Sequence, residues 1–195
     1  MQVKKPRNIK DDDLYTKPAD FDRPLSESTA MSYYIQRIPL AELCRDAADI
    51  TWELTVAADA TCIAYERILE LDQRFVDLLN GLPHFLRFDK GSDMDGQIRD
   101  GAHLQTEKQK YFSYLTIQAR RCKLHLPFLL RVAQDERYQF SRETSLRSAR
   151  NLLQLRHIIP SQNSSATSVR IIGVLHHFFC GISNFQPYSA SVNTR

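Results

Sequence analysis

Apolar residues recur at helical spacing between residues 64 and 78, and this pattern constrains the fold more than any other feature of the chain. They follow one another in steps of four, three, four and three: Ala64, Ile68, Leu71, Phe75 and Leu78. Such steps place side chains on one face of an α-helix. Charged residues lie between them, and Glu70 precedes Arg74 in the order that stabilises an exposed helix face. The segment therefore predicts an amphipathic helix that packs against other elements.

Two further segments show the same spacing. Residues 28–54 carry apolar side chains three or four apart, and a helix is expected to start near residues 28 and 29. Pro39 lies inside this pattern, and because proline lacks a backbone N–H we expect it to kink the helix or split it in two. Residues 111–126 carry another apolar face, which ends at Pro127.

The remaining helices are expected near the carboxyl end of the chain. Ser141 is a favourable N-cap for one of them, and residues 169–180 form a very apolar segment that predicts another. No stretch alternates between apolar and polar residues in the way typical of a β-strand. The sequence therefore predicts an all-α fold, an irregular bundle of about five main helices without a sheet.

Composition divides the chain into three parts. Residues 1–25 hold three prolines, three consecutive aspartates and few apolar side chains, so we expect an extended arm. Residues 26–183 contain the helical segments and form the domain, and residues 184–195 are expected to be a polar, disordered tail.

Charge and cysteine usage exclude several classes of protein. A formal net charge of +3 is too weak to indicate a nucleic-acid surface without a clustered basic patch. The four cysteines (Cys44, Cys62, Cys122 and Cys180) are isolated at apolar helix positions, so we expect reduced thiols in the cytosol or nucleus. No apolar run approaches the length of about 20 residues that a membrane span needs.

No metal site is complete in the sequence. Residues 89–96 resemble a calcium loop, but the alignment places Gly91 and Ala102 where oxygen ligands are required. His176, His177 and Cys180 include a His/Cys pair four residues apart, yet no second pair supplies the other zinc ligands. We therefore expect no cofactor in this chain.

Two other features have simple structural interpretations. His125 would need a nearby nucleophile to act as a general base, and the spacing places none, so it is interpreted as a core histidine at a helix end. Residues 120–156 contain nine Arg or Lys against three Asp or Glu. Without the interleaved aromatic residues of single-strand binders, this stretch is interpreted as a solvated helix face.

Five segments in a fixed order carry a family pattern. They are a Pro-Arg-Asn-Ile entry, a helix with Ile-Gln-Arg-Ile, a helix through Leu-Asp that ends in Leu-Pro, a Leu-His-x-Pro-Phe-Leu segment, and a Tyr-x-x-Ser-Arg helix entry. In this chain they occupy residues 6–14, 35–42, 71–83, 124–129 and 138–149. Together they resemble the fungal-specific transcription factor domain, the regulatory middle region of fungal zinc-cluster regulators, which includes the regulatory domain of xylanolytic activators.

The resemblance implies a non-enzymatic, nuclear protein that regulates transcription through contacts with transcription factors or co-regulators, and self-association. DNA binding and zinc are properties of the family's zinc-cluster domain, whose six cysteines this chain does not contain. The chain is thus expected to be a partial regulatory domain that contacts DNA only through an absent N-terminal domain, with no membrane role. The motif residues are expected to be structural: Asn8, Leu71, Asp72, Pro83, His125, Pro127, Phe128, Ser141, Arg142 and Ala149.

The chain departs from the family pattern at Leu126, where the family usually has arginine, so any ion pair of that arginine is absent. A competing hypothesis is an α-helical enzyme or small-ligand module built around His125, His176 and His177.

Overall fold

Four long helices dominate the part of the chain that the structure describes. In the computed structural model these residues are 4–56, 61–88, 101–129 and 135–158. The long helices are α2 (Ser32–Val56), α3 (Thr61–Asn80), α4 (Gly101–His125) and α5 (Gln139–Ile158), preceded by the single turn α1 (Asp13–Thr16). No strand occurs within these ranges, so the expectation of an all-α fold is confirmed.

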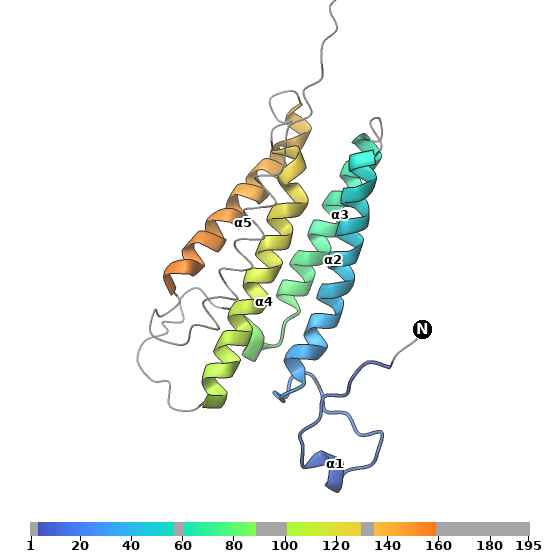
Figure 1. Ribbon diagram of the computed structural model, residues 1–195, viewed down its shortest axis with the longest axis vertical. Helices are drawn as coiled ribbons and strands as arrows, with labels where there is room; N and C mark the ends of the chain where they lie inside the picture. The colour runs from blue at the N-terminus through green and yellow to red at the C-terminus, as the bar shows by residue number, and fades with distance from the viewer. Residues whose placement is uncertain (1–3, 57–60, 89–100, 130–134, 159–195) are drawn as a thin grey trace, which may run out of the picture. The chain divides into compact units, whose positions relative to one another are not determined.

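The long helices contact one another as two extensive pairs. Helix α2 packs on α3, and α4 packs on α5; in Figure 1 the members of each pair run in opposite directions. Fewer contacts join α3 and α2 to α4. One core cluster contains the predicted positions Ile68, Leu71 and Phe75 of α3, and Leu78 packs against it partly buried. The buried members of this cluster are Leu40, Leu43, Ile50, Ile68, Leu71, Phe75, Leu82, Ile117, Leu124, Phe128 and Tyr138.

Helix α2 passes through Pro39 as one element, so the division considered from the sequence does not occur. It also begins at Ser32, a few residues later than expected. Pro39 removes one backbone hydrogen bond from the helix. Leu40 and Leu43 follow it directly and are buried in the core. This packing compensates for the lost hydrogen bond and keeps the helix continuous.

The prediction that Ser141 caps the fourth helix is wrong. Helix α5 begins at Gln139, directly after the 3₁₀ turn η4 (Glu136–Tyr138), so Ser141 lies inside its first turn. Asp135 instead caps the preceding turn η4, because its Oδ1 accepts a hydrogen bond from the backbone N–H of Arg137 at 2.9 Å. The expected helix at 169–180 and the expected tail at 184–195 lie outside the described residues.

The N-terminal segment, expected to be extended, folds back on itself around Asn8. The Asn8 side-chain amide donates to the carbonyl oxygens of Pro24 and Glu27 at 3.0 and 3.1 Å. Its Oδ1 accepts hydrogen bonds from the hydroxyls of Thr29 and Ser32 at 2.6 and 2.8 Å. Asn8 is buried within this set of hydrogen bonds. These bonds fix the segment to the start of α2.

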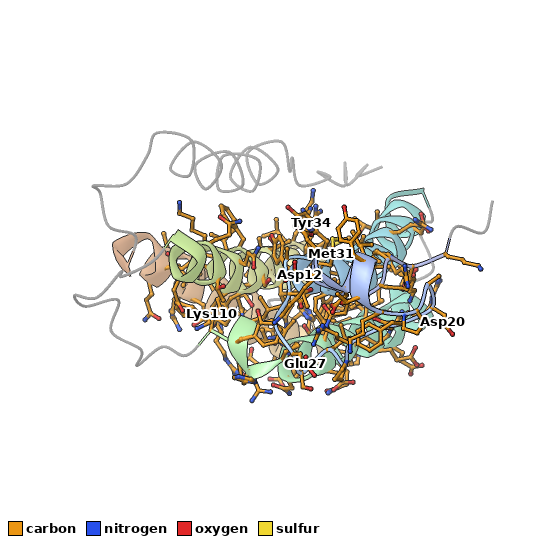
Figure 2. The ribbon with its side chains drawn as sticks, turned by 90° about the horizontal axis from the view of Figure 1, so that it is seen from below. Asp12, Asp20, Glu27, Met31, Tyr34 and Lys110 are labelled. Atoms are coloured by element: carbon orange, nitrogen blue, oxygen red, sulfur yellow. The ribbon has the colours of Figure 1, made fainter. Side chains whose placement is uncertain are left out.

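A second contact closes the same segment. Arg23 donates two hydrogen bonds to the Asp13 carboxylate, both at 2.6 Å, and the backbone N–H of Lys10 donates a third. These hydrogen bonds, led by that of Arg23, lower the pKa of Asp13 to about 2. Figure 2 labels Asp12 and Glu27 on this segment, at the end of the helices nearest the viewer. The segment thus closes through polar bonds, which apolar periodicity does not reveal.

We predict that Asn8→Asp releases the N-terminal segment, because a carboxylate cannot donate to the facing carbonyl oxygens and would repel them. Leaving buried polar groups unsatisfied costs about 1–3 kcal/mol each. Limited proteolysis by chymotrypsin at Tyr15 and Phe21 should therefore accelerate about 10-fold or more. The exposed Asp20 provides the control, Asp20→Asn, and equal cleavage rates in the two variants would contradict this role of Asn8.

Candidate functional site

A buried carboxylate on α3 organises the junction of α3, α4 and α5. Asp72 is only 3% exposed and faces Arg121 of α4. Nε of Arg121 donates to Oδ1 at 2.6 Å, and Nη2 donates to Oδ2 at 2.8 Å. This two-pronged geometry is the strongest form of carboxylate recognition by arginine. The contact thus fixes α3 against α4 at one defined position.

His125 extends this contact to α5. It lies one helical turn after Arg121 on α4, and its Nε2 is 3.1 Å from Oδ1 of Asp72. Nε2 makes no well-directed hydrogen bond within the described part of the chain, so we interpret this approach as an electrostatic contact. Nδ1 lies 2.8 Å from Oγ of Ser141 in the first turn of α5. The hydroxyl of Ser141 in turn donates to Tyr65 of α3 at 3.1 Å.

The Ser141 hydroxyl joins two of these groups, because it donates to Tyr65 while Nδ1 of His125 contacts the same oxygen. We refer to Tyr65, Asp72, Arg121, His125 and Ser141 as the junction network.

An aromatic cluster packs beside the junction network. The 3₁₀ turn η2 (Leu126–Phe128), with Pro127 in its first positions, directs Phe128 into the core. The ring of Tyr65 lies 5.0 Å from that of Phe128 and 4.8 Å from that of Tyr138. Such spacings are typical of favourable aromatic pairs. The cluster shields the polar network from solvent on one side.

The structure brings together only part of the predicted motif residues. Asp72, His125 and Ser141 meet at this junction. Phe128 packs on Tyr65 beside it, Pro127 lies in the adjoining turn, and Leu71 is buried in the core. The other four lie elsewhere: Pro83 precedes the turn η1 (His84–Leu86), Arg142 is exposed on α5, Ala149 is half-buried on α5, and Asn8 holds the N-terminal segment.

Sequence reasoning missed Arg121 and Tyr65. Both had a detectable signal, because Arg121 lies four residues before His125 and Tyr65 lies three residues before the buried Ile68. Residues at these spacings share a helix face. A polar residue on the face of a motif histidine is therefore a candidate partner.

The connection from Ser141 through His125 to Asp72 resembles the relay of a serine hydrolase, but it lacks the accessibility of one. Ser141 and His125 are both 0% exposed, and the Ser141 oxygen is already bonded to Tyr65. Arg121 binds both oxygens of Asp72. A substrate cannot reach the hydroxyl in this arrangement, so the geometry holds helices together and gives no support to His125 as a catalytic base.

Metal sites, cysteines and membrane-spanning helices are the other features that could carry a function in the described part of the chain. Among the described residues, no group of three or more His, Cys, Asp or Glu side chains is placed to hold a metal ion. The two cysteines whose surroundings are described, Cys44 and Cys122, are free thiols. No helix in the described ranges combines the length and apolar character needed to cross a membrane.

The electrostatic balance at Asp72 is set by opposing effects. Burial raises the pKa of its carboxyl, while the hydrogen bonds from Arg121 and the contact with His125 lower it more strongly, to about 2. The carboxylate is therefore ionised in the folded protein at neutral pH. The hydrogen bonds from Arg121 and the contact with His125, and not solvent, stabilise this negative charge.

Comparison with known proteins finds fungal transcription factors. The chain is 38% identical over 181 residues to the probable transcription factor lepB of Aspergillus flavus, which covers 92% of this chain and 32% of that protein. It is 32% identical over 159 residues to the transcription factor TAS2 of Pyricularia oryzae, covering 79% of this chain and 20% of TAS2. It is 26% identical over 185 residues to the agnestins biosynthesis cluster transcription factor AgnL11 of Paecilomyces divaricatus, covering 92% and 25%.

The chain thus spans less than a third of the length of these relatives. No protein-family model matches it. No solved structure matches it at a significant level. The relatives support the resemblance to fungal transcription factors, whereas the assignment to a regulatory domain rests on the sequence motifs.

We predict that Asp72→Asn destabilises the protein strongly, because it leaves the Arg121 guanidinium without its partner. Breaking a buried ion pair from one side costs about 3–5 kcal/mol. The matched control is Asp46→Asn, which removes an ion pair with Arg74 whose side chains are 42% and 54% exposed. Such exposed pairs contribute about 0–1 kcal/mol. Urea denaturation followed by circular dichroism compares the two, and equal losses would refute the special role of Asp72.

Acid should lower the free energy of unfolding of the protein in a defined pH range. The pKa of Asp72 falls from 3.8 to about 2 on folding, so its stabilising effect is complete above pH 4 and is lost as the pH falls towards 2. This loss amounts to about 2 kcal/mol. Urea midpoints between pH 6 and pH 2.5 measure it. The decline below pH 4 should be shallower in Asp72→Asn, and an unchanged pH dependence in that variant would count against this assignment.

Proposed function

We propose that the chain is a non-catalytic regulatory domain of a fungal transcription factor and acts in the nucleus. The observation that carries this proposal is its similarity, over 92% of its length, to a protein named as a probable transcription factor. The geometry supports it, since the motif side chains Asp72, His125 and Ser141 bind one another. In this proposal the motif preserves a helical scaffold whose surface makes regulatory contacts.

The competing hypothesis of a histidine-based enzyme or ligand module draws no support from His125. That side chain is buried, and its nitrogens face Ser141 and Asp72. His176 and His177 lie outside the described residues. The names of the relatives favour regulation over catalysis.

DNA reading is assigned in this proposal to another part of the transcription factor. The chain contains four cysteines and therefore cannot supply the six-cysteine zinc cluster that its resemblance associates with DNA binding. Zinc accordingly belongs to that other part as well. The role left for these residues is control of activity through protein contacts.

The outer face of α5 is the best candidate for such a contact. Leu146 and Leu153 are 37% and 51% exposed, and the exposed Arg142 and Arg150 lie on the same face, in steps of four, four and three residues. Exposed apolar residues flanked by arginine favour a partner that is both acidic and apolar. We propose that an acidic segment of a co-regulator binds here.

A reporter assay tests this function. The full chain is fused to an unrelated DNA-binding domain and compared with that domain alone, and we expect a change in reporter output. Losing both leucines from the contact should weaken partner binding about 10-fold. Leu146→Ser combined with Leu153→Ser should therefore return the output towards that of the DNA-binding domain alone.

Two controls make this assay decisive. Gln154→Ser changes an exposed polar residue of the same helix and should retain the effect. The chain without the fused domain should leave the reporter unchanged, because DNA reading is assigned elsewhere. An unchanged reporter with the intact fusion would contradict the regulatory function, and an unaffected leucine variant would contradict the proposed surface.

A further inference from the structure

A cavity that is open to solvent lies between α2 and α4, and none of its lining residues belongs to the junction network. Its volume is about 260 Å³. Helix α2 contributes Cys44, Ala47, Ala48 and Thr51, and α4 contributes Arg120, Lys123 and Leu124. The volume is slightly below the range of roughly 300–1,000 Å³ typical of ligand pockets. The cavity therefore suits a small molecule.

The lining of the cavity is mostly small and apolar. Ala47, Ala48 and the buried Leu124 offer methyl and methylene groups. The hydroxyl of Thr51 donates to the carbonyl oxygen of Ala47 at 2.7 Å, so its proton is already used within the helix. An occupant therefore meets a largely apolar surface on these residues.

Two cations lie at the same cavity without acidic partners. Arg120 and Lys123 are exposed, and three residues separate them on one face of α4. Neither forms an ion pair with a residue in the described ranges, whereas Arg121 and Lys110 of the same helix pair with Asp72 and Glu107. Two adjacent positive charges without counter-charges attract an anion.

The thiol in the cavity is a weak nucleophile at neutral pH. Burial raises the pKa of Cys44, and the positive charge of Arg120 opposes that rise without cancelling it. The thiol therefore stays protonated at neutral pH and contributes a weakly polar contact. This favours reversible binding over covalent chemistry. It also supplies a reporter group within the cavity wall.

We propose that this cavity binds a small organic anion, whose carboxylate is held by Arg120 and Lys123 and whose short apolar chain covers Ala47, Ala48 and Leu124. Arginine and lysine supply charge-assisted hydrogen bonds to carboxylates. The ligand would bridge α2 and α4, two helices that otherwise share few contacts. This inference concerns binding alone and does not rest on the proposed regulatory function.

Hexanoate is the probe, and hexanamide is its uncharged control. We expect saturable binding of hexanoate to the full chain with a Kd of about 1 mM, because a ligand with so few atoms gains little binding free energy. Binding is measured by NMR titration. Arg120→Gln and Lys123→Gln should each weaken it about 10-fold, because each removes a charged donor. Arg147→Gln, which removes an exposed arginine of α5, should leave the affinity unchanged.

Alkylation of Cys44 reports the location of binding. Saturating hexanoate should slow its reaction with iodoacetamide at least several-fold, as followed by peptide mass mapping, while hexanamide should not. The proposal is overturned if hexanamide binds equally well, if the Arg120 and Lys123 variants bind like Arg147→Gln, or if Cys44 reacts at the same rate with hexanoate present. These readouts are independent of the reporter assay, so failure of one proposal is distinguishable from failure of the other.

Discussion

The hydrogen-bonded ion pair between Asp72 and Arg121 is the interaction on which the arrangement of the helices depends. Helices α2 and α3 form one extensive pair and α4 and α5 form another, while fewer contacts join the two pairs. Asp72 lies where α3 meets α4, and His125 carries the same contact to Ser141 of α5. One carboxylate on α3 therefore ties both helices of the second pair to the first.

Joining helices through a buried ion pair costs free energy of desolvation, so the pair must provide something that apolar contacts do not. Replacing such a pair by apolar residues is often neutral or stabilising, whereas breaking it from one side is severely destabilising. Apolar surfaces alone allow neighbouring helices to slide, but the fork of Arg121 fits Asp72 in one position only. We infer that the junction network fixes the register of α3 against α4. The regulatory role that we propose would use such a fixed register to present a constant surface.

Apolar periodicity predicted the all-α fold and a buried face on α3, and both are confirmed, whereas Leu146 and Leu153 of α5 are exposed despite their apolar character. Ile68, Leu71 and Phe75 are buried as their spacing indicates, and the fold is all-α. Features that depend on tertiary partners were not predictable in the same way. Pro39 lies in a continuous helix because the core holds the residues after it, and Ser141 forms a hydrogen bond to a distant histidine instead of capping its own helix.

The same distinction, between local sequence pattern and tertiary partners, explains which parts of the candidate site could be predicted. Motif resemblance selected Asp72, His125 and Ser141, yet only the three-dimensional structure shows that they bind one another and that Arg121 completes the group. The fold of the N-terminal segment was missed because Asn8 acts through polar bonds to backbone carbonyls, which leave no periodic pattern. Local sequence thus identified important residues but not the partners that define their roles.

A double-mutant cycle on Asp72 and Arg121 tests the central claim most directly. The free energy of unfolding is measured for the unaltered chain, Asp72→Asn, Arg121→Gln and the double variant. The account predicts strong coupling, of about 2 kcal/mol or more, because each single change leaves its partner buried and unpaired. Additive effects, with a coupling energy near zero, would contradict the claim that this ion pair joins the two pairs of helices.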